Sequence, residues 1–219
     1  MKKMKEFWSW LEDSDPPKNW RESKEYLNVA DLLEKTFTEG PGIRFAIWLQ
    51  GCPIRCKGCW NQHMWDFTSK HVVKVEKLVE YILSFNNDIE GITLVGGEPL
   101  FQAKGVVNLM YRIKRESNLS IVLYTGYSVE QITTKYALEA FNMADIVITG
   151  PYIEEKRNIF LRWRGSENQK VIFHNKIYKK KYSKKTIMNI AELHIDKASG
   201  EVVLIGFPDD DLLRGVKNE

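Results

Sequence analysis

Apolar and polar positions change period repeatedly along residues 36–175, and this change predicts strands separated by helices. Short apolar runs predict buried strands at Ile43–Leu49, Ile92–Val95, Ser120–Tyr124, Asp145–Ile148 and Val171–Phe173. Apolar residues at helical spacing predict helices over Val72–Phe85 and Val106–Ile113, and Ser128 can cap a helix that runs through Leu138. Repeated strand–helix units predict an α/β fold with a parallel sheet, either open or curled into part of a barrel.

Both ends of the chain depart from this pattern. Residues 1–35 are rich in charge, and the apolar residues of Phe7–Leu11 predict a short amphipathic helix packed on the main body. Residues 176–219 begin with a lysine-rich loop, and the strands predicted at Asn189–Ile195 and Glu201–Ile205 form a β-hairpin before a short terminal helix. The expected division is therefore an N-terminal extension (1–35), a core (36–175) and a C-terminal zone (176–219).

The composition is that of an ordinary globular chain of 219 residues, 43% hydrophobic and 28% charged. A net charge of +3 gives no reason to expect a nucleic-acid or membrane partner. Acidic residues interrupt the basic start of the chain, so it does not have the pattern of a signal peptide. No window approaches the roughly 18 apolar residues of a membrane helix. We therefore expect a cytoplasmic protein, where thiols stay reduced and clustered cysteines indicate metal or redox chemistry.

All three cysteines lie in the stretch GCPIRCKGCWN, at Cys52, Cys56 and Cys59. A C-x3-C-x2-C loop can direct three thiolates at one centre. One interpretation is a structural zinc site of the Cys3His type, in which His63 supplies the fourth ligand. The other is a four-iron cluster held by three cysteines, which leaves one iron open to a small molecule. The spacing alone leaves both interpretations open.

A second motif, Val95-Gly96-Gly97-Glu98-Pro99, follows a predicted strand. Parallel α/β folds place their active sites at the carboxyl ends of strands. The two glycines permit a close approach to the backbone, and the Glu98 carboxylate suits an ammonium group. A simple turn with a solvated glutamate is the alternative, and the cysteine loop about forty residues upstream argues against it.

Together the cysteine loop and GGEP resemble the radical S-adenosylmethionine (SAM) enzymes, whose core is a partial (β/α) barrel. The resemblance implies that Cys52, Cys56 and Cys59 hold a 4Fe-4S cluster whose fourth iron is chelated by SAM. It also implies that Glu98 and the backbone of Gly96 and Gly97 bind the methionine amino group. SAM would then be cleaved reductively to a 5′-deoxyadenosyl radical that abstracts hydrogen.

Further segments resemble the glycyl-radical-enzyme activases, and among them the anaerobic ribonucleotide reductase activating proteins. These segments are Glu39–Arg44 (EGPGIR), Trp60-Asn61, Trp65–Phe67 (WDF), Tyr124–Tyr127 (YTGY), Gly150–Glu155 (GPYIEE) and Arg164–Gln169 (RGSENQ). The resemblance adds Pro99, Thr125 and Gly126 to the expected cofactor-binding residues, with Gly58 and Trp60 at the adenine. Thr149 stands where this branch often has an aspartate.

The branch implies a glycine of a glycyl radical enzyme, such as anaerobic ribonucleotide reductase, as the substrate. It also implies a one-electron donor such as flavodoxin or ferredoxin. A radical SAM enzyme that modifies another peptide, a nucleotide or a small molecule is the alternative, because the two terminal zones fall outside the activase pattern. A non-enzymatic Cys3His zinc module is the third hypothesis.

Overall fold

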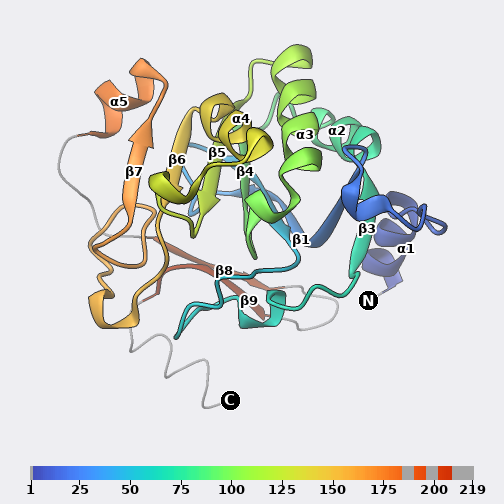
Figure 1. The fold of residues 1–219 in the computed structure, drawn as a ribbon. Helices are drawn as coiled ribbons and strands as arrows, with labels where there is room; N and C mark the ends of the chain where they lie inside the picture. Colours follow the sequence, from blue (N-terminus) through green and yellow to red (C-terminus); the bar gives the residue numbers. More distant parts are fainter. Residues whose placement is uncertain (1, 184–189, 196–201, 209–219) are drawn as a thin grey trace.

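The computed structural model describes residues 2–183, 190–195 and 202–208, and its centre is a seven-stranded sheet (Figure 1). The strand order is β3-β1-β2-β4-β5-β6-β7. The strands are β1 (Tyr26–Thr36), β2 (Arg44–Leu49), β3 (His71–Lys74), β4 (Gly91–Gly96), β5 (Ser120–Thr125), β6 (Ile146–Thr149) and β7 (Lys170–Phe173). Strands β2, β4, β5 and β6 pair in parallel, whereas β1, β3 and β7 join by antiparallel pairing. The carboxyl ends of the parallel strands therefore meet at one edge.

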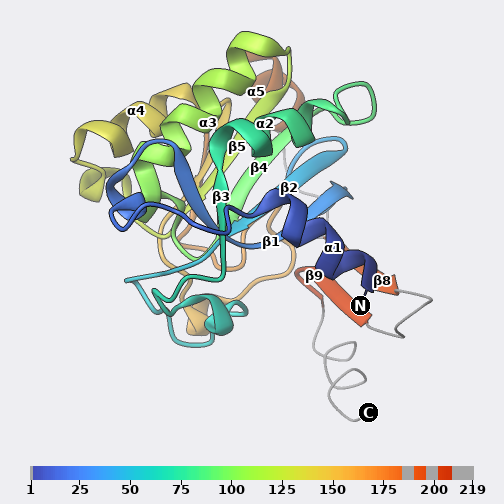
Figure 2. The same cartoon turned by 90° about the vertical axis from the view of Figure 1, so that its right-hand side faces the viewer.

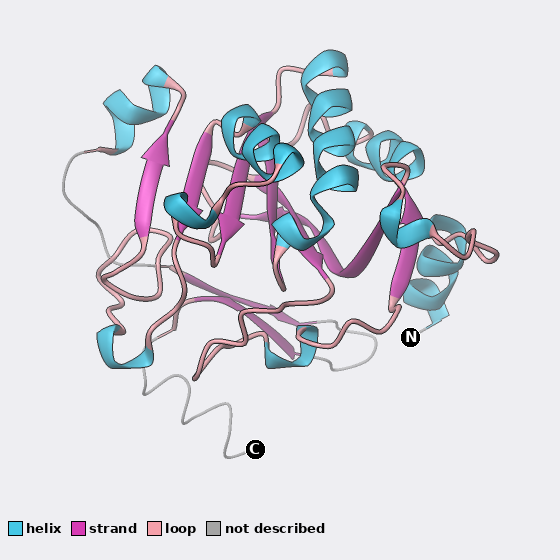
Figure 3. Ribbon diagram, viewed as in Figure 1, coloured by secondary structure: helices cyan, strands magenta, loops and turns pink. Residues whose placement is uncertain are grey.

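Helices α2 (Val75–Leu83), α3 (Ala103–Glu116) and α4 (Lys135–Met143) cover one face of this sheet (Figure 3). A separate hairpin of β8 (Ala191–Ile195) and β9 (Val202–Gly206) lies on the other side (Figure 2). Helix α1 (Lys2–Leu11) and the short helix α5 (Lys176–Tyr182) lie towards the two edges of the sheet. The predicted α/β class with a parallel centre is confirmed, and closure into a partial barrel stays a prediction.

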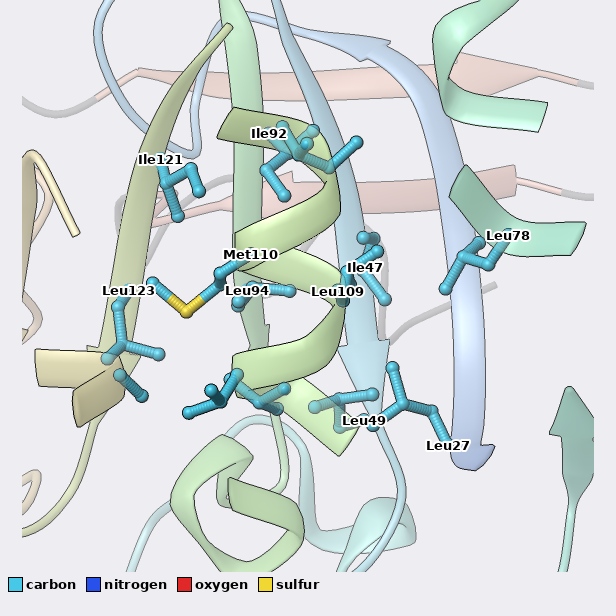
Figure 4. Packing of buried hydrophobic residues seen from close by; sticks show 14 of the residues in the cluster. Leu27, Ile47, Leu49, Leu78, Ile92, Leu94, Leu109, Met110, Ile121 and Leu123 are labelled. Carbon is cyan, nitrogen blue, oxygen red and sulfur yellow. The ribbon is translucent and has the colours of Figure 1, made fainter. Parts of the chain in front are cut away.

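The main core lies between the sheet and the helices. Along β2 the odd-numbered residues Phe45, Ile47 and Leu49 belong to this core, because neighbouring residues of a strand point to opposite faces. Helix α3 brings Leu109 and Met110 against the same face (Figure 4). The even-numbered Ala46 and Trp48 pack on the other face with Met64 and Ile205. Burial on both faces explains why this strand is apolar throughout.

Several predicted elements differ from the structure. Strand β1 was not predicted, and it pairs with both β2 and β3. Residues 72–74, predicted as the first turn of a helix, form β3, since pairing with β1 outweighs their helical spacing. The helix expected after Ser128 begins only at Lys135, after the short η4 helix (Val129–Gln131). The predicted lysine-rich loop contains α5, which Asn175 caps by accepting a bond from Ile177 N at 3.0 Å.

Three other expectations concern the ends of the chain. The amphipathic helix of the N-terminal zone is present as α1, and the hairpin strands are present as β8 and β9. The Ser199-Gly200 turn and the terminal helix fall outside the described residues. The division at residues 35 and 175 stays a prediction, although β1 starts at Tyr26 and is bonded into the central sheet. Within the described part of the chain, every helix is too short or too polar to cross a membrane.

Candidate functional site

The cysteine loop begins directly after β2, at the carboxyl edge of the parallel strands. Two backbone bonds hold its start, from Gly51 N to Met64 O at 2.8 Å and from Cys52 N to Trp65 O at 3.1 Å. A turn closes its end, where Cys59 N donates to Cys56 O at 3.1 Å. All three cysteines are free thiols, and they line one cavity of about 340 Å³. The three thiols therefore border the same space, and their convergence on one metal centre stays a prediction.

Backbone N–H groups already point at two of these sulfurs. Burial raises the pKa of the Cys52 thiol, and bonds from the N–H groups of Arg55 and Ile54 act against that rise. Burial likewise raises the pKa of Cys56, against a bond from Tyr152 N–H. Hydrogen bonds of this kind favour the thiolate, which is the form that binds metals. The donor set therefore fits an iron–sulfur cluster.

The arrangement is less suited to a single metal ion. Within the described residues, no group of three or more His, Cys, Asp or Glu side chains could hold one ion. A zinc ion needs all of its ligand atoms within about 2.3 Å of itself, whereas each cysteine of a four-iron cluster can bind a different iron. His63 lines the cavity but its side chain is exposed. Among the described residues, His63 and the cysteines thus form no single-ion site.

The segment after β6 fastens the cysteine loop from outside. Lys57 Nζ lies 3.2 Å from Glu154 Oε2 and 3.3 Å from Glu155 Oε1. Gly58 has φ +72°, and a Cβ there would lie 2.7 Å from Glu154 Oε1. The positive φ at position 58 disfavours any residue with a Cβ, which explains why glycine precedes the third cysteine.

Glu98 is buried, at 1% exposure, with its carboxylate held by three donors. Oε1 accepts bonds from Leu100 N and Thr125 Oγ1, each at 2.9 Å, and Oε2 accepts from Gly126 N at 2.8 Å. Burial raises its pKa to about 7 in spite of these bonds. A carboxylate offers about four acceptor positions, so Glu98 keeps capacity for one further donor in the cavity that it lines.

The glycines of GGEP are packed against the chain itself. Gly97 N donates to Leu49 O at 2.7 Å, and Glu98 N donates to Gly51 O at 2.9 Å. A Cβ on Gly96 would lie 2.5 Å from Leu49 N, and one on Gly97 would lie 2.5 Å from Gly51 O. The sequence predicted that a ligand would approach these glycines closely. In the structure, the backbone that leads into the cysteine loop lies against them.

The remaining predicted residues divide into two groups. Those that line the cavity with the cysteines are Trp60, Gly96, Gly97, Glu98, Thr125 and Gly126. Trp60 is 39% exposed at the cavity, so its ring can cover a bound group. Gly58 and Pro99 do not line the cavity, because Gly58 faces Glu154 and Pro99 begins the η3 helix (Pro99–Gln102). Their assignment to cofactor binding stays a prediction.

Several cavity residues had no individual role in the sequence-based site. Glu39, in the EGPGIR segment, is only 7% exposed and lines the cavity. Tyr124 lines it too, and its buried hydroxyl has no hydrogen-bond partner among the described residues. Both belong to segments that carry the family resemblance, and this resemblance is the feature of the sequence that could have identified them as site residues. The hairpin residues Leu204–Phe207 also line the cavity, and no local pattern places them there.

Glu39 leads to a prediction about pH. Burial, followed by the nearby Glu192 carboxylate, raises the pKa of Glu39 to about 7 from an ordinary 4.5. The ionised form is thus disfavoured in the fold, so stability falls as pH rises from about 5 to about 8. Glu39→Gln should match the wild type at pH 5 and exceed its free energy of unfolding by about 3 kcal/mol at pH 8.5. Urea unfolding of the metal-free chain measures this difference.

The matched control for this substitution is Glu139→Gln, at an exposed position of α4. We expect the control to follow the wild type at both pH values. If Glu39→Gln also follows the wild type at both values, Glu39 ionises freely in the fold and the assigned environment is wrong.

Comparison with known proteins adds independent findings. Residues 38–172 match the family model described as a 4Fe-4S single cluster domain. The anaerobic ribonucleoside-triphosphate reductase-activating protein of Vibrio cholerae is 33% identical over 150 residues, 65% of this chain and 96% of that protein. The protein of the same name from Enterobacteria phage T4 is 32% identical, over 66% of this chain and 93% of its own length. That of Escherichia coli K12 is 28% identical, over 68% and 99%.

A solved structure is also similar, at a greater distance. The crystal structure of QueE from Escherichia coli aligns with a TM-score of 0.38 and 16% identity, covering 61% of this chain and 73% of that chain. This similarity is too low to bear on fold or function.

Proposed function

This chain belongs to the family of anaerobic ribonucleoside-triphosphate reductase-activating proteins, and residues 38–172 match a 4Fe-4S single cluster domain. We propose that it cleaves SAM and so places a radical on a partner enzyme. The observation that carries the proposal is the shared cavity, which brings three free thiols and the Glu98 carboxylate together. The thiols suit a soft metal centre, and the carboxylate suits the ammonium group of an amino acid.

Cys52, Cys56 and Cys59 would hold three irons of a 4Fe-4S cluster, and the chain contains no cysteine for the fourth. When reduced, such a cluster supplies the electron that splits bound SAM into methionine and a 5′-deoxyadenosyl radical, which takes a hydrogen atom from the substrate. The protein's part is to bind, orient and exclude water. The N–H groups of Ile54, Arg55 and Tyr152 would favour the thiolate form of Cys52 and Cys56, against the burial that raises the pKa of both thiols.

Glu98 would receive the amino group of SAM at its remaining acceptor position. An ammonium group there compensates the burial that raises the pKa of this carboxyl, since an opposite charge favours the ionised form. The N–H groups of Gly97 and Glu98 are bonded within the chain, so contacts from this turn to SAM use its carbonyl oxygens. Thr125 and Gly126 orient the Glu98 carboxylate. The Trp60 ring, which lines the cavity, would border the adenine, and the backbone at Gly58 would reach it only from beside the cavity.

The proposed substrate is a glycine of a glycyl radical enzyme, most simply an anaerobic ribonucleotide reductase. Hydrogen transfer from the glycine Cα would give 5′-deoxyadenosine and leave the unpaired electron on the glycine. The electron that starts the cycle would come from a one-electron donor such as flavodoxin or ferredoxin. The alternative is a radical SAM enzyme with another substrate, and the observation in its favour is that hairpin residues beyond the family match line the cavity.

The test of this proposal is an anaerobic reconstitution with iron and sulfide. We expect a reduced-state EPR signal that changes on addition of SAM, and 5′-deoxyadenosine on addition of dithionite. Mixing this protein with the anaerobic ribonucleotide reductase encoded in the same genome should give a glycyl radical signal. Formation of 5′-deoxyadenosine without any glycyl radical would favour the alternative substrate class, and stoichiometric zinc without iron would reject both.

A further inference from the structure

The hairpin of β8 and β9 lies beyond residues 38–172 and yet completes the site. It lies on the face of the central sheet that the helices leave open, behind the strands in Figure 4. Ile205 is 8% exposed and packs with Ala46 and Trp48 of β2 and with Met64 after the cysteine loop. The hairpin is therefore part of the hydrophobic packing on the cavity side of the sheet.

Polar contacts fasten the open end of the hairpin to two other segments. Glu192 Oε2 accepts a bond from Thr36 Oγ1 at 2.6 Å, and its Oε1 accepts one from Phe37 N at 2.8 Å. At the same end of the hairpin, just after β9, Arg157 Nη2 donates to Pro208 O at 2.7 Å. The open end of the hairpin is thus tied both to the end of β1 and to the segment that follows β6.

Four consecutive residues of this element, Leu204–Phe207, line the cavity that the cysteines and Glu98 also line. Phe207 lies against Gly165 of the RGSENQ segment. A Cβ added to Gly165 would come within 2.6 Å of Phe207 Cε1. Leu204, Ile205 and Phe207 present only apolar side chains. This wall therefore offers apolar contact to whatever enters, and no metal ligand.

The same apolar surface continues outside the cavity. Leu193 pairs with Leu204 and Ile195 pairs with Val202 across the hairpin, so these four side chains share one face. Leu193, Ile195 and Val202 are 51%, 59% and 49% exposed. Val203 points to the opposite face, because successive residues of a strand alternate. An apolar strip thus runs from the solvent to Leu204 at the cavity.

The volume limits what the cavity itself can take. At about 340 Å³ it lies near the lower end of the roughly 300–1,000 Å³ of ligand pockets. A cavity of this size can enclose no more than a short segment of a protein substrate. The rest of a protein substrate must then be held at the mouth.

We propose that the hairpin is the substrate-selecting wall of the site, where Leu204 and Phe207 contact the glycine-bearing segment of the partner enzyme. Leu193, Ile195 and Val202 then bind apolar side chains that flank the glycine along an extended segment. This inference rests on the proposed function, since it takes a glycyl radical enzyme as the partner. It assigns a substrate-binding role to an element that lies beyond the matched domain.

The test compares Leu204→Ala and Phe207→Ala with Val203→Ala, a neighbouring position of β9 that does not line the cavity. Each protein is reconstituted and mixed with the anaerobic ribonucleotide reductase of the same genome. We expect the reductase concentration for half-maximal glycyl radical to rise roughly tenfold in each of the first two variants, the size typical of losing an anchoring apolar side chain. The Val203→Ala control should behave as the wild type.

Three further readouts separate the possible outcomes. Circular dichroism and thermal melting show whether a variant is folded, and Leu193→Ala, at an exposed position, serves as a second substrate-face variant that leaves the cavity unchanged. The inference would be overturned if the reductase concentration for half-maximal glycyl radical stayed unchanged in Leu193→Ala, Leu204→Ala and Phe207→Ala. It would also be overturned by weaker SAM binding in the EPR titration with an unchanged half-maximal reductase concentration at saturating SAM, because the wall would then serve the cofactor. Absence of a glycyl radical with the wild-type chain would instead reject the proposed function, and this inference with it.

Discussion

Replacing Cys56 with alanine is expected to remove the iron–sulfur EPR signal and reduce 5′-deoxyadenosine to background. The chain has three cysteines and all line one cavity, so no other thiol can take the place of Cys56. Its sulfur also accepts the Tyr152 N–H bond, which draws the segment after β6 towards the cysteine loop. Iron and sulfide analysis after anaerobic reconstitution, together with dithionite-driven SAM cleavage, measures the effect.

His63→Ala is the matched control for the cysteine substitution. His63 lines the same cavity and is the residue that a Cys3His zinc site would require. We expect this variant to keep its iron and its SAM cleavage. Loss of metal in His63→Ala to the same degree as in Cys56→Ala would contradict the open-cluster interpretation and restore the zinc interpretation.

Replacing Glu98 with glutamine should weaken SAM binding about 10- to 150-fold while the cluster still assembles. The range corresponds to the 1.5–3 kcal/mol of a hydrogen bond to a charged group, here the lost carboxylate–ammonium contact. The glutamine amide would also face the Gly126 N–H, now bonded to Oε2 at 2.8 Å, so the fold should lose about 1–3 kcal/mol. Titration of the EPR change with SAM measures the first effect, and urea unfolding measures the second.

The two effects separate the possible roles of Glu98. Glu130→Gln, on the exposed η4 helix at the same edge of the sheet, is the control and should alter neither quantity. If Glu98→Gln loses stability but binds SAM as the wild type does, then Glu98 only ties β4 to β5 through Thr125 and Gly126. That result would remove it from the cofactor site.

The central strands could be predicted from the sequence because each is buried on both faces. The apolar run of β2 needs no partner to be recognised, since apolar residues on both sides predict a covered strand. The run YLNVADLLEKT of β1 mixes polar and apolar residues, and β1 becomes a strand through its pairing with β2 and β3. Val72 and Val73 have helical spacing with the residues that follow, yet as part of β3 they pair with Asn28 and Leu27, respectively. Strand pairing is a tertiary interaction, so local patterns miss it.

The candidate site divides in the same way. The sequence by itself determined the chemical groups: three thiols in one short loop, a Gly-Gly-Glu turn after a strand, and the order of segments that carries the family resemblance. These depend on residue type and local spacing. It also left His63 open as a ligand, because spacing does not say how far apart the liganding atoms lie.

Only the tertiary structure decided how these groups are used. It placed three protein donors on the Glu98 carboxylate and turned the GGEP glycines towards the backbone of the cysteine loop. It also closed the cavity with Leu204–Phe207, which lie about 150 residues from the cysteines in the chain. The physical reason is that burial, and the pKa shifts and packing that follow from it, depends on contacts between distant segments. Such contacts leave no periodic mark in either segment alone.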